Sequence, residues 1–217
     1  MISIAFYIYI TILAISFLTS ITEYFKKEKL QYLVYFPPFL LITLVVEIIG
    51  RVTAVKGINN GPLYNIFLPS EYLFYFFTLH NIIQNHRYKK YILYACTIHS
   101  IFTLTSLLLD GLYVFPTLIY SFGAILILVF CALYFYQLIE LPVFPKPTQE
   151  PSFWIVCGLL IFYGGTLPIW ATTNLAHNFS ESVLKIEIFI LMALNCILYS
   201  FFVIAFLSKV KHQNSTS

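Results

Sequence analysis

Long apolar stretches alternate with short polar clusters along the whole chain. Seven of these stretches are close to the roughly 20 mostly apolar residues that a helix needs to cross a bilayer. They are Ile2–Ser20, Gln31–Val52, Leu63–Ile83, Tyr91–Leu109, Pro116–Leu138, Phe153–Thr173 and Val183–Leu207. The pattern predicts an all-α polytopic membrane protein, a bundle of seven transmembrane helices. We expect a single domain over residues 1–208 and a short polar cytoplasmic tail over residues 209–217.

The amino-acid composition independently excludes a soluble protein. Of the 217 residues, 60% are hydrophobic and 10% are charged, whereas a soluble domain has about 45–50% and about 25%. A compact soluble fold of this length leaves too much surface in water to hide so many apolar side chains. Disordered chains are poor in aromatic residues, but 19% of this chain is aromatic. The apolar side chains are therefore expected to face the lipid bilayer.

The first apolar stretch differs from a secretory signal peptide in where its charges lie. A signal peptide carries positive charges before its apolar stretch, whereas here Lys26, Lys27 and Lys29 follow it. This order is typical of a retained span whose amino terminus lies outside.

The distribution of Lys and Arg over the links supports the same orientation, because basic residues concentrate in cytoplasmic loops. With the amino terminus outside, nine of the twelve basic residues are inside: Lys26, Lys27, Lys29, Arg87, Lys89, Lys90, Lys146, Lys209 and Lys211. Arg51, Lys56 and Lys185 are outside. We therefore predict an outer amino terminus and a cytoplasmic carboxyl terminus. The net charge of +3 then reflects orientation and not nucleic-acid binding, which needs a basic face on a water-exposed domain.

Four ionisable residues fall inside the predicted spans: Glu47, Arg51, Glu71 and Glu187. Such a group at a helix centre costs about 2.5–3.5 kcal/mol on insertion scales and usually faces a partner, water or the bundle interior. Glu47 and Arg51 are four residues apart and can form an ion pair on one helix face. This pair could simply neutralise charge at the outer interface, but it does not explain Glu71 and Glu187.

The polar residues of four spans lie at similar depths toward the outer side. Tyr163, Thr166, Trp170 and Asn174 follow one another at helical spacing in the sixth span. Pro69 and Pro168 are expected to interrupt the third and sixth spans at these depths. The sequence therefore predicts an outward-facing intramembrane ligand pocket. Its candidate residues are Glu47, Arg51, Asn65, Glu71, Thr166, Trp170, Asn174 and Glu187.

No metal ligand, cofactor or catalytic residue is predicted. His80, His99 and His177 are at different depths, whereas a catalytic zinc site needs about three converging ligands. The four cysteines fall in four different spans, as expected for free buried thiols. A retinal pigment would need a lysine deep in the last span, but Lys185 is at its outer edge.

The stretch from Gly57 to Phe77, GINNGPLYNIFLPSEYLFYFF, has Glu47 upstream and the segment Phe162-Tyr-Gly-Gly-Thr166 downstream. In these features the chain resembles uncharacterised seven-span integral membrane proteins of Bacteroidota-type bacteria. That group has no assigned activity, so the resemblance implies only a multi-pass protein of the bacterial inner membrane.

Three function classes follow from these observations. The favoured hypothesis is binding or transport of a small polar or cationic molecule at the carboxylate-lined pocket, by a sensor or a transporter. The alternative is a structural or accessory membrane subunit whose polar residues hold helices together. The least favoured is an intramembrane enzyme that uses a carboxylate pair on a lipid. The sequence leaves the ligand, the direction of any transport and the oligomeric state open.

Overall fold

The computed structural model describes residues 2–26, 29–140, 147–172 and 180–215, and the regular structure within these ranges is helical. The helices are α1 (Ile2–Ile21), α2 (Gln31–Val34), α3 (Phe36–Val55), α4 (Gly61–Ile82), α5 (His86–Leu109), α6 (Thr117–Glu140), α7 (Pro151–Thr172) and α8 (Glu181–Ser215). Two short 3-10 helices cover Thr22–Phe25 and Pro147–Gln149. The all-α prediction is confirmed, and each predicted apolar stretch contains one long helix.

Local chemistry explains where several helices begin. α3 starts with Pro37 in its first turn, where a backbone N–H has no helical partner and proline is well tolerated. The side chain of Asn85 caps α5 by accepting a hydrogen bond from the backbone nitrogen of Arg87, at 2.9 Å. α5 therefore starts at His86, five residues before the apolar stretch that predicted it, because the cap and not apolarity sets its beginning.

Proline does not interrupt the two helices in which breaks were expected. Pro69 lies inside α4 and Pro168 inside α7, and both helices continue through these residues. The expected interruptions are therefore wrong. In a bundle, neighbouring helices and local adjustments can compensate for the hydrogen bond that a proline removes.

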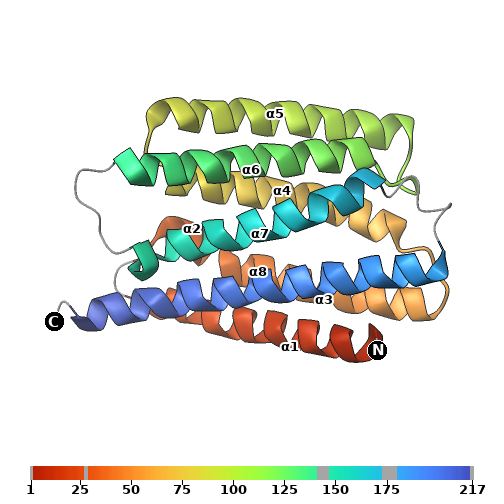
Figure 1. Ribbon diagram of the computed structural model, residues 1–217, viewed down its shortest axis with the longest axis horizontal. Coiled ribbons are helices and arrows are strands. Elements are labelled where there is room, and N and C mark those ends of the chain that lie inside the picture. The colour runs from red at the N-terminus through yellow and green to blue at the C-terminus, as the bar shows by residue number, and fades with distance from the viewer. Residues whose placement is uncertain (1, 27–28, 141–146, 173–179, 216–217) are drawn as a thin grey trace.

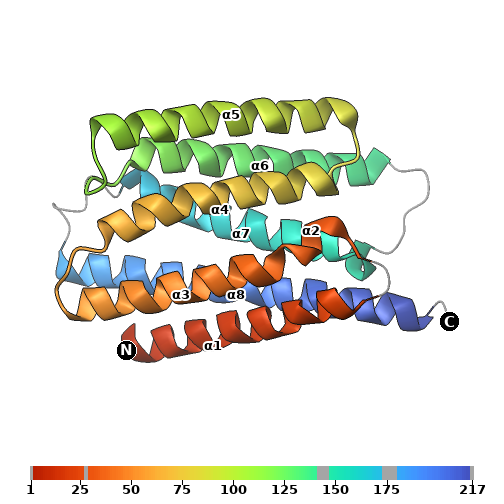
Figure 2. The same cartoon turned by 180° about the vertical axis from the view of Figure 1, so that it is seen from behind.

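The seven long helices of the described chain form a closed ring. α1 packs against α3, α3 against α4, α4 against α5, and α5 against α6. The ring continues through α7 and α8 and closes where α8 packs against α1, while α4 also contacts α6 across it. Figures 1 and 2 show α6, α7 and α8 on one side and α3 and α4 on the other, with α5 and α1 at the two edges. The termini lie at opposite ends of the bundle (Figure 1).

Small residues bring α7 close to α8. A side chain added at Gly165 would place its Cβ 2.7 Å from Cδ2 of Leu194, and one at Gly158 would lie 3.0 Å from Cβ of Phe201. The two glycines are seven residues apart and so lie on one face of α7. They allow the close backbone approach that small residues commonly provide between membrane helices.

The ring is joined at one end by a buried ion pair. Lys26 pairs with Glu23, and its Nζ also donates a hydrogen bond to the carbonyl oxygen of Phe206 in α8, at 3.0 Å. Glu23 is fully buried and Lys26 is 9% exposed. The start of the α1–α2 link is thereby attached to the last helix.

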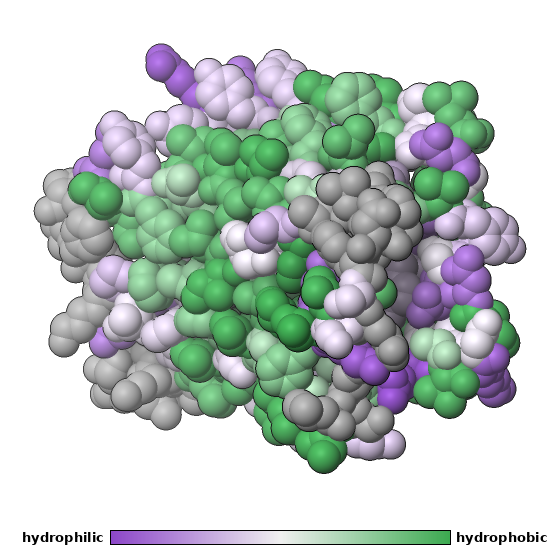
Figure 3. All heavy atoms as spheres, turned by 45° about the vertical axis from the view of Figure 1, so that its right-hand side comes forward, coloured by the Kyte–Doolittle hydropathy of each residue, from purple (hydrophilic) through white to green (hydrophobic). Residues whose placement is uncertain are grey.

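Six helices of the described chain are long and apolar enough to cross a membrane. α4 is the seventh long helix and is not among them, because it carries Asn65, Ser70, Glu71 and His80. α4 is instead covered by its neighbours, with Tyr72 and Tyr75 almost completely buried. Figure 3 shows apolar side chains over the flank of the bundle and hydrophilic ones toward its ends. The chain is therefore a multi-pass helical membrane protein in contact with a lipid bilayer.

Candidate functional site

A cavity of about 600 Å³ lies inside the ring at the amino-terminal end, defined as the end with the amino terminus and the α3–α4 link. Its volume lies in the usual range for small-molecule sites, roughly 300–1,000 Å³. α1, α3, α4, α7 and α8 supply most of its wall. The lining residues are Phe6, Tyr9, Thr43, Glu47, Gly50, Arg51, Ala54, Asn60, Gly61, Tyr64, Phe67, Leu68, Glu71, Phe115, Phe162, Trp170, Ile188, Leu191, Met192, Asn195 and Tyr199.

Glu47 lies in the α3 wall of the cavity and is half-buried. Its Oε2 accepts a long hydrogen bond from the hydroxyl of Tyr64 in α4, at 3.5 Å. The Tyr64 ring lies directly against Gly50, at a place that a larger residue would occupy. Gly50 therefore allows the tyrosine to reach Glu47 across the α3–α4 interface.

Glu71 lies at the middle of α4 and is only 6% exposed, although it lines the cavity. The lining also includes Tyr9 of α1 and Tyr199 of α8, whose ring centres lie 6.0 Å apart. The buried hydroxyls of Tyr9 and Tyr163 have no hydrogen-bond partner in the described chain. Buried polar groups of this kind are normally satisfied by a protein group or by water. The cavity wall therefore combines the Glu71 carboxylate with the hydroxyl of Tyr9, which can offer a hydrogen bond.

Arg51 does not form the predicted ion pair with Glu47. Its guanidinium carbon lies over the ring of Phe6 in α1, 5.2 Å from the ring centre. No ion pair between two described residues joins Arg51 to either Glu47 or Glu71. The prediction from the four-residue spacing was therefore wrong, and Phe6, from another helix, offers the guanidinium an aromatic face.

The two cavity carboxylates, Glu47 and Glu71, form no ion pair within the part of the chain that the structure describes. The described residues also contain no group of three or more His, Cys, Asp or Glu side chains that could hold a metal ion. A buried carboxylate without a partner is costly, so this pair of groups is the most unusual chemical feature of the cavity.

Asn65, predicted as a ligand-binding residue, has a structural position. It is 1% exposed and does not line the cavity. Its Nδ2 donates to the carbonyl oxygens of Leu112 and Val114 at 2.7 and 2.8 Å, and its Oδ1 accepts from the hydroxyl of Tyr120 at 3.2 Å. These bonds attach the α5–α6 link to α4.

The other candidates divide between the cavity and its surroundings. Trp170 lines the cavity, whereas Thr166 is completely buried behind it and its hydroxyl has no hydrogen-bond partner in the described chain. Glu187 is half-buried on α8 but does not line the cavity. Asn174 lies outside the described residues. The structure thus brings four predicted residues together around one space: Glu47, Arg51, Glu71 and Trp170.

Sequence reasoning missed most of the aromatic lining. Tyr9 and Tyr199 face each other from α1 and α8, with ring centres 6.0 Å apart, and neither was a candidate. A signal existed for Tyr64, which precedes Glu71 by seven residues and so shares its helix face. For Phe6 and Tyr9 the sequence gives no such signal, because no charged residue marks the cavity face of α1.

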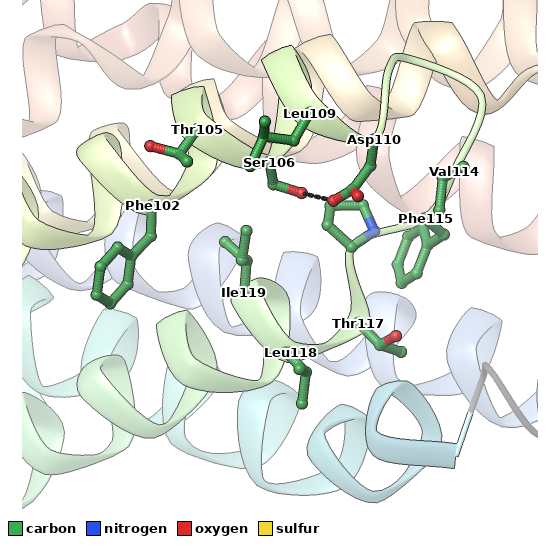
Figure 4. A pocket seen from close by; sticks show the side chains of 11 residues that line it. Phe102, Thr105, Ser106, Leu109, Asp110, Val114, Phe115, Thr117, Leu118 and Ile119 are labelled. Carbon is green, nitrogen blue, oxygen red and sulfur yellow. Dashed lines mark hydrogen bonds between the residues drawn. The ribbon is translucent and has the colours of Figure 1, made fainter.

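A second hollow of about 460 Å³ lies where α5 turns into α6. Figure 4 shows the hydroxyl of Ser106 bonded to the carboxylate of Asp110, at 2.8 Å, among mostly apolar side chains such as Phe102 and Ile119. None of the predicted site residues lines this hollow. The first cavity is therefore the stronger candidate for function.

Comparison with protein families, curated proteins and solved structures finds no match to this chain. The resemblance to seven-span proteins of Bacteroidota-type bacteria thus gains no family assignment. A functional assignment therefore depends on the fold and the cavity alone.

Proposed function

We propose that this protein crosses the bacterial inner membrane seven times and binds a small cationic or polar molecule in the cavity between α1, α3, α4, α7 and α8. The seventh crossing would be α4. With 22 residues it is about 33 Å long, close to the roughly 30 Å of a bilayer core. Termini at opposite ends of the bundle fit an odd number of crossings. The bias of Lys and Arg places the amino-terminal end, and with it the cavity, on the outer side.

The observation that carries this proposal is the pair of carboxylates, Glu47 and Glu71, which line one cavity and form no ion pair with any residue that the structure describes. Ionisable residues inside a membrane are expensive and usually functional. A purely structural role would be expected to tie such groups to neighbouring helices, as Asn65 is tied to the α5–α6 link. Glu47 has one long hydrogen bond to Tyr64 of α4, at 3.5 Å, but both carboxylates line the open space of the cavity. A partner from solution is the simplest reason to keep them there.

Packing below the cavity favours binding from the outer side. On the carboxyl-terminal side of the cavity, Phe39 and Phe74 stack with ring centres 3.8 Å apart, and Phe36 and Phe202 pack at 5.1 Å. This aromatic core closes the ring toward the other end. A receptor would keep this form, whereas a transporter would have to separate these rings to release its substrate inward.

Thiol labelling tests the proposal without knowledge of the ligand. In a variant with all four native cysteines replaced, Asn195→Cys places a thiol in the cavity wall. A membrane-impermeant thiosulfonate reagent with a trimethylammonium group should label it from outside faster than one with a sulfonate group. Glu47→Gln should reduce that ratio by about tenfold or less, because removing one nearby charge in a partly wet site is worth about 1 kcal/mol.

The control is Ile4→Cys, at a residue of α1 that is 66% exposed; it gives the rate ratio that the two reagents show toward a thiolate outside the cavity. Labelling of Asn195→Cys only from the cytoplasmic side would refute the proposed orientation. A rate ratio at Asn195→Cys no higher than at Ile4→Cys would refute the proposed preference for cations.

A further inference from the structure

We infer that the ligand is an organic ammonium ion, held with its charge near Glu47 and Glu71 and its carbon body against the aromatic walls of the cavity. This inference rests on the proposed function and specifies the class of ligand. Its basis is what surrounds the two carboxylates, which differs from the surroundings that an inorganic cation needs.

An inorganic cation lacks the ligands that would hold it. Calcium takes six to eight oxygen ligands, and magnesium needs a near-octahedral shell. The described residues contain no cluster of three acidic, histidine or cysteine side chains. Many of the other lining residues present carbon surfaces, such as Phe67, Leu68 and Leu191. A dehydrated metal ion would therefore lose its water shell and gain little in return.

An organic ammonium ion, in contrast, matches the aromatic lining. The aromatic residues of the cavity come from α1, α4, α7 and α8 and from the link before α6: Phe6, Tyr9, Tyr64, Phe67, Phe115, Phe162, Trp170 and Tyr199. The faces of such rings attract cations, and groups of them are a known recognition device for quaternary ammonium ligands. The wall already binds one cation in this way, because the Arg51 guanidinium lies over Phe6 at 5.2 Å.

The size of the cavity points to the same class. A water molecule takes about 30 Å³ of liquid volume, so 600 Å³ has room for roughly twenty waters or for one organic molecule with an apolar body. A bare inorganic ion would leave most of this aromatic surface wet. An ammonium ion with a carbon body removes that surface from water, which is favourable, and brings the positive charge that the carboxylates lack.

The experiment uses the purified full-length protein in lipid nanodiscs. Choline and 3,3-dimethylbutan-1-ol have the same shape and differ only in the charged nitrogen. They are compared by calorimetry, together with benzyltrimethylammonium, sodium chloride and calcium chloride. At least one ammonium ion should bind saturably, and choline should bind at least about fivefold more tightly than its neutral counterpart, given the usual strength of cation–π contacts.

Matched variants test the assigned residues. Glu47→Gln and Glu71→Gln should each weaken ammonium binding by about tenfold or more, and Glu140→Gln, an exposed glutamate at the end of α6, should not. If a cavity variant does not fold, the comparison of choline with its neutral counterpart in the wild-type protein still decides the question.

Equal binding of choline and the alcohol would overturn the inference, as would ammonium binding that survives both cavity variants. Binding of sodium or calcium but of no ammonium ion would also overturn it and leave an inorganic cation site. In these cases the proposed function would still stand if Asn195→Cys keeps its preference for the cationic reagent. No binding together with no preference would refute both.

Discussion

Replacing Gly123 by alanine should destabilise the bundle, although alanine is the better helix former. Gly123 lies in α6, where the backbone packs against two buried rings. A Cβ at this position would lie 2.6 Å from Nε2 of His99 and 2.7 Å from Cε1 of Tyr72. Both distances are too short for real contacts, so one of the rings or α6 itself has to move.

Neither ring can move easily. His99 and Tyr72 are each 1% exposed, and their ring centres are only 4.7 Å apart. The Tyr72 hydroxyl also donates to the carbonyl oxygen of Tyr120, at 2.7 Å. Overpacking of this kind costs about 1–3 kcal/mol, while replacing glycine in a helix gains at most about 1 kcal/mol. The matched control is Gly164→Ala in α7, where the nearest atom would lie at an ordinary 3.9 Å.

Because both variants gain the same helix propensity, their difference isolates the overpacking cost of about 1–3 kcal/mol. For a chain of this size, each kcal/mol shifts the Tm by roughly 2–4 °C. Gly123→Ala should therefore unfold about 2–12 °C below Gly164→Ala in thermal scans of the detergent-solubilised protein. If the two variants have the same Tm, α6 does not pack against Tyr72 of α4 and His99 of α5 as described.

Two further changes test how the ends of the bundle are held. Lys26→Met should lower stability by about 3–5 kcal/mol because it removes the ion-pair partner of the buried Glu23. The same change at the exposed Lys29 should have little effect, and equal losses in denaturant titrations would argue against a buried pair. Asn65→Ala should cost about 1–3 kcal/mol because it removes two hydrogen bonds to the α5–α6 link, each worth about 0.5–1.5 kcal/mol. Proteases should then cut this link faster than in Asn81→Ala, and unchanged protection would show that other contacts hold the link.

The hydrophobic pattern was sufficient to predict the fold class and the positions of the long helices. It works because a membrane helix must satisfy its own backbone and present apolar side chains to lipid. α4 marks the limit of this reasoning, since its polar residues place it apart from the six strongly apolar helices. Its burial among the other helices, and not its own composition, explains why it belongs to the bundle.

The candidate site was only partly predictable, because spacing within one helix does not show what the other helices bring. A spacing of four residues, about one helical turn, suggested that Arg51 meets Glu47, but the Arg51 guanidinium lies over Phe6 of α1. Asn65 was a reasonable candidate by depth, yet its side chain turns toward the α5–α6 link. In both cases the deciding contact comes from a distant part of the sequence. The position of each residue along its helix could be read from the sequence, but the rotation of each helix about its axis could not.

The contact that closes the ring has a consequence for how the protein is made. Lys26 and Phe206 are separated by 180 residues along the chain. At synthesis rates of about 5–20 residues per second, the second partner emerges on the order of ten to forty seconds after the first. During that interval α1 and α3 lack α8, the helix that completes the cavity wall, and the cavity that contains Glu47 stays open on that side. During biogenesis, an incomplete ring of helices must therefore persist in the membrane until the final helix is inserted.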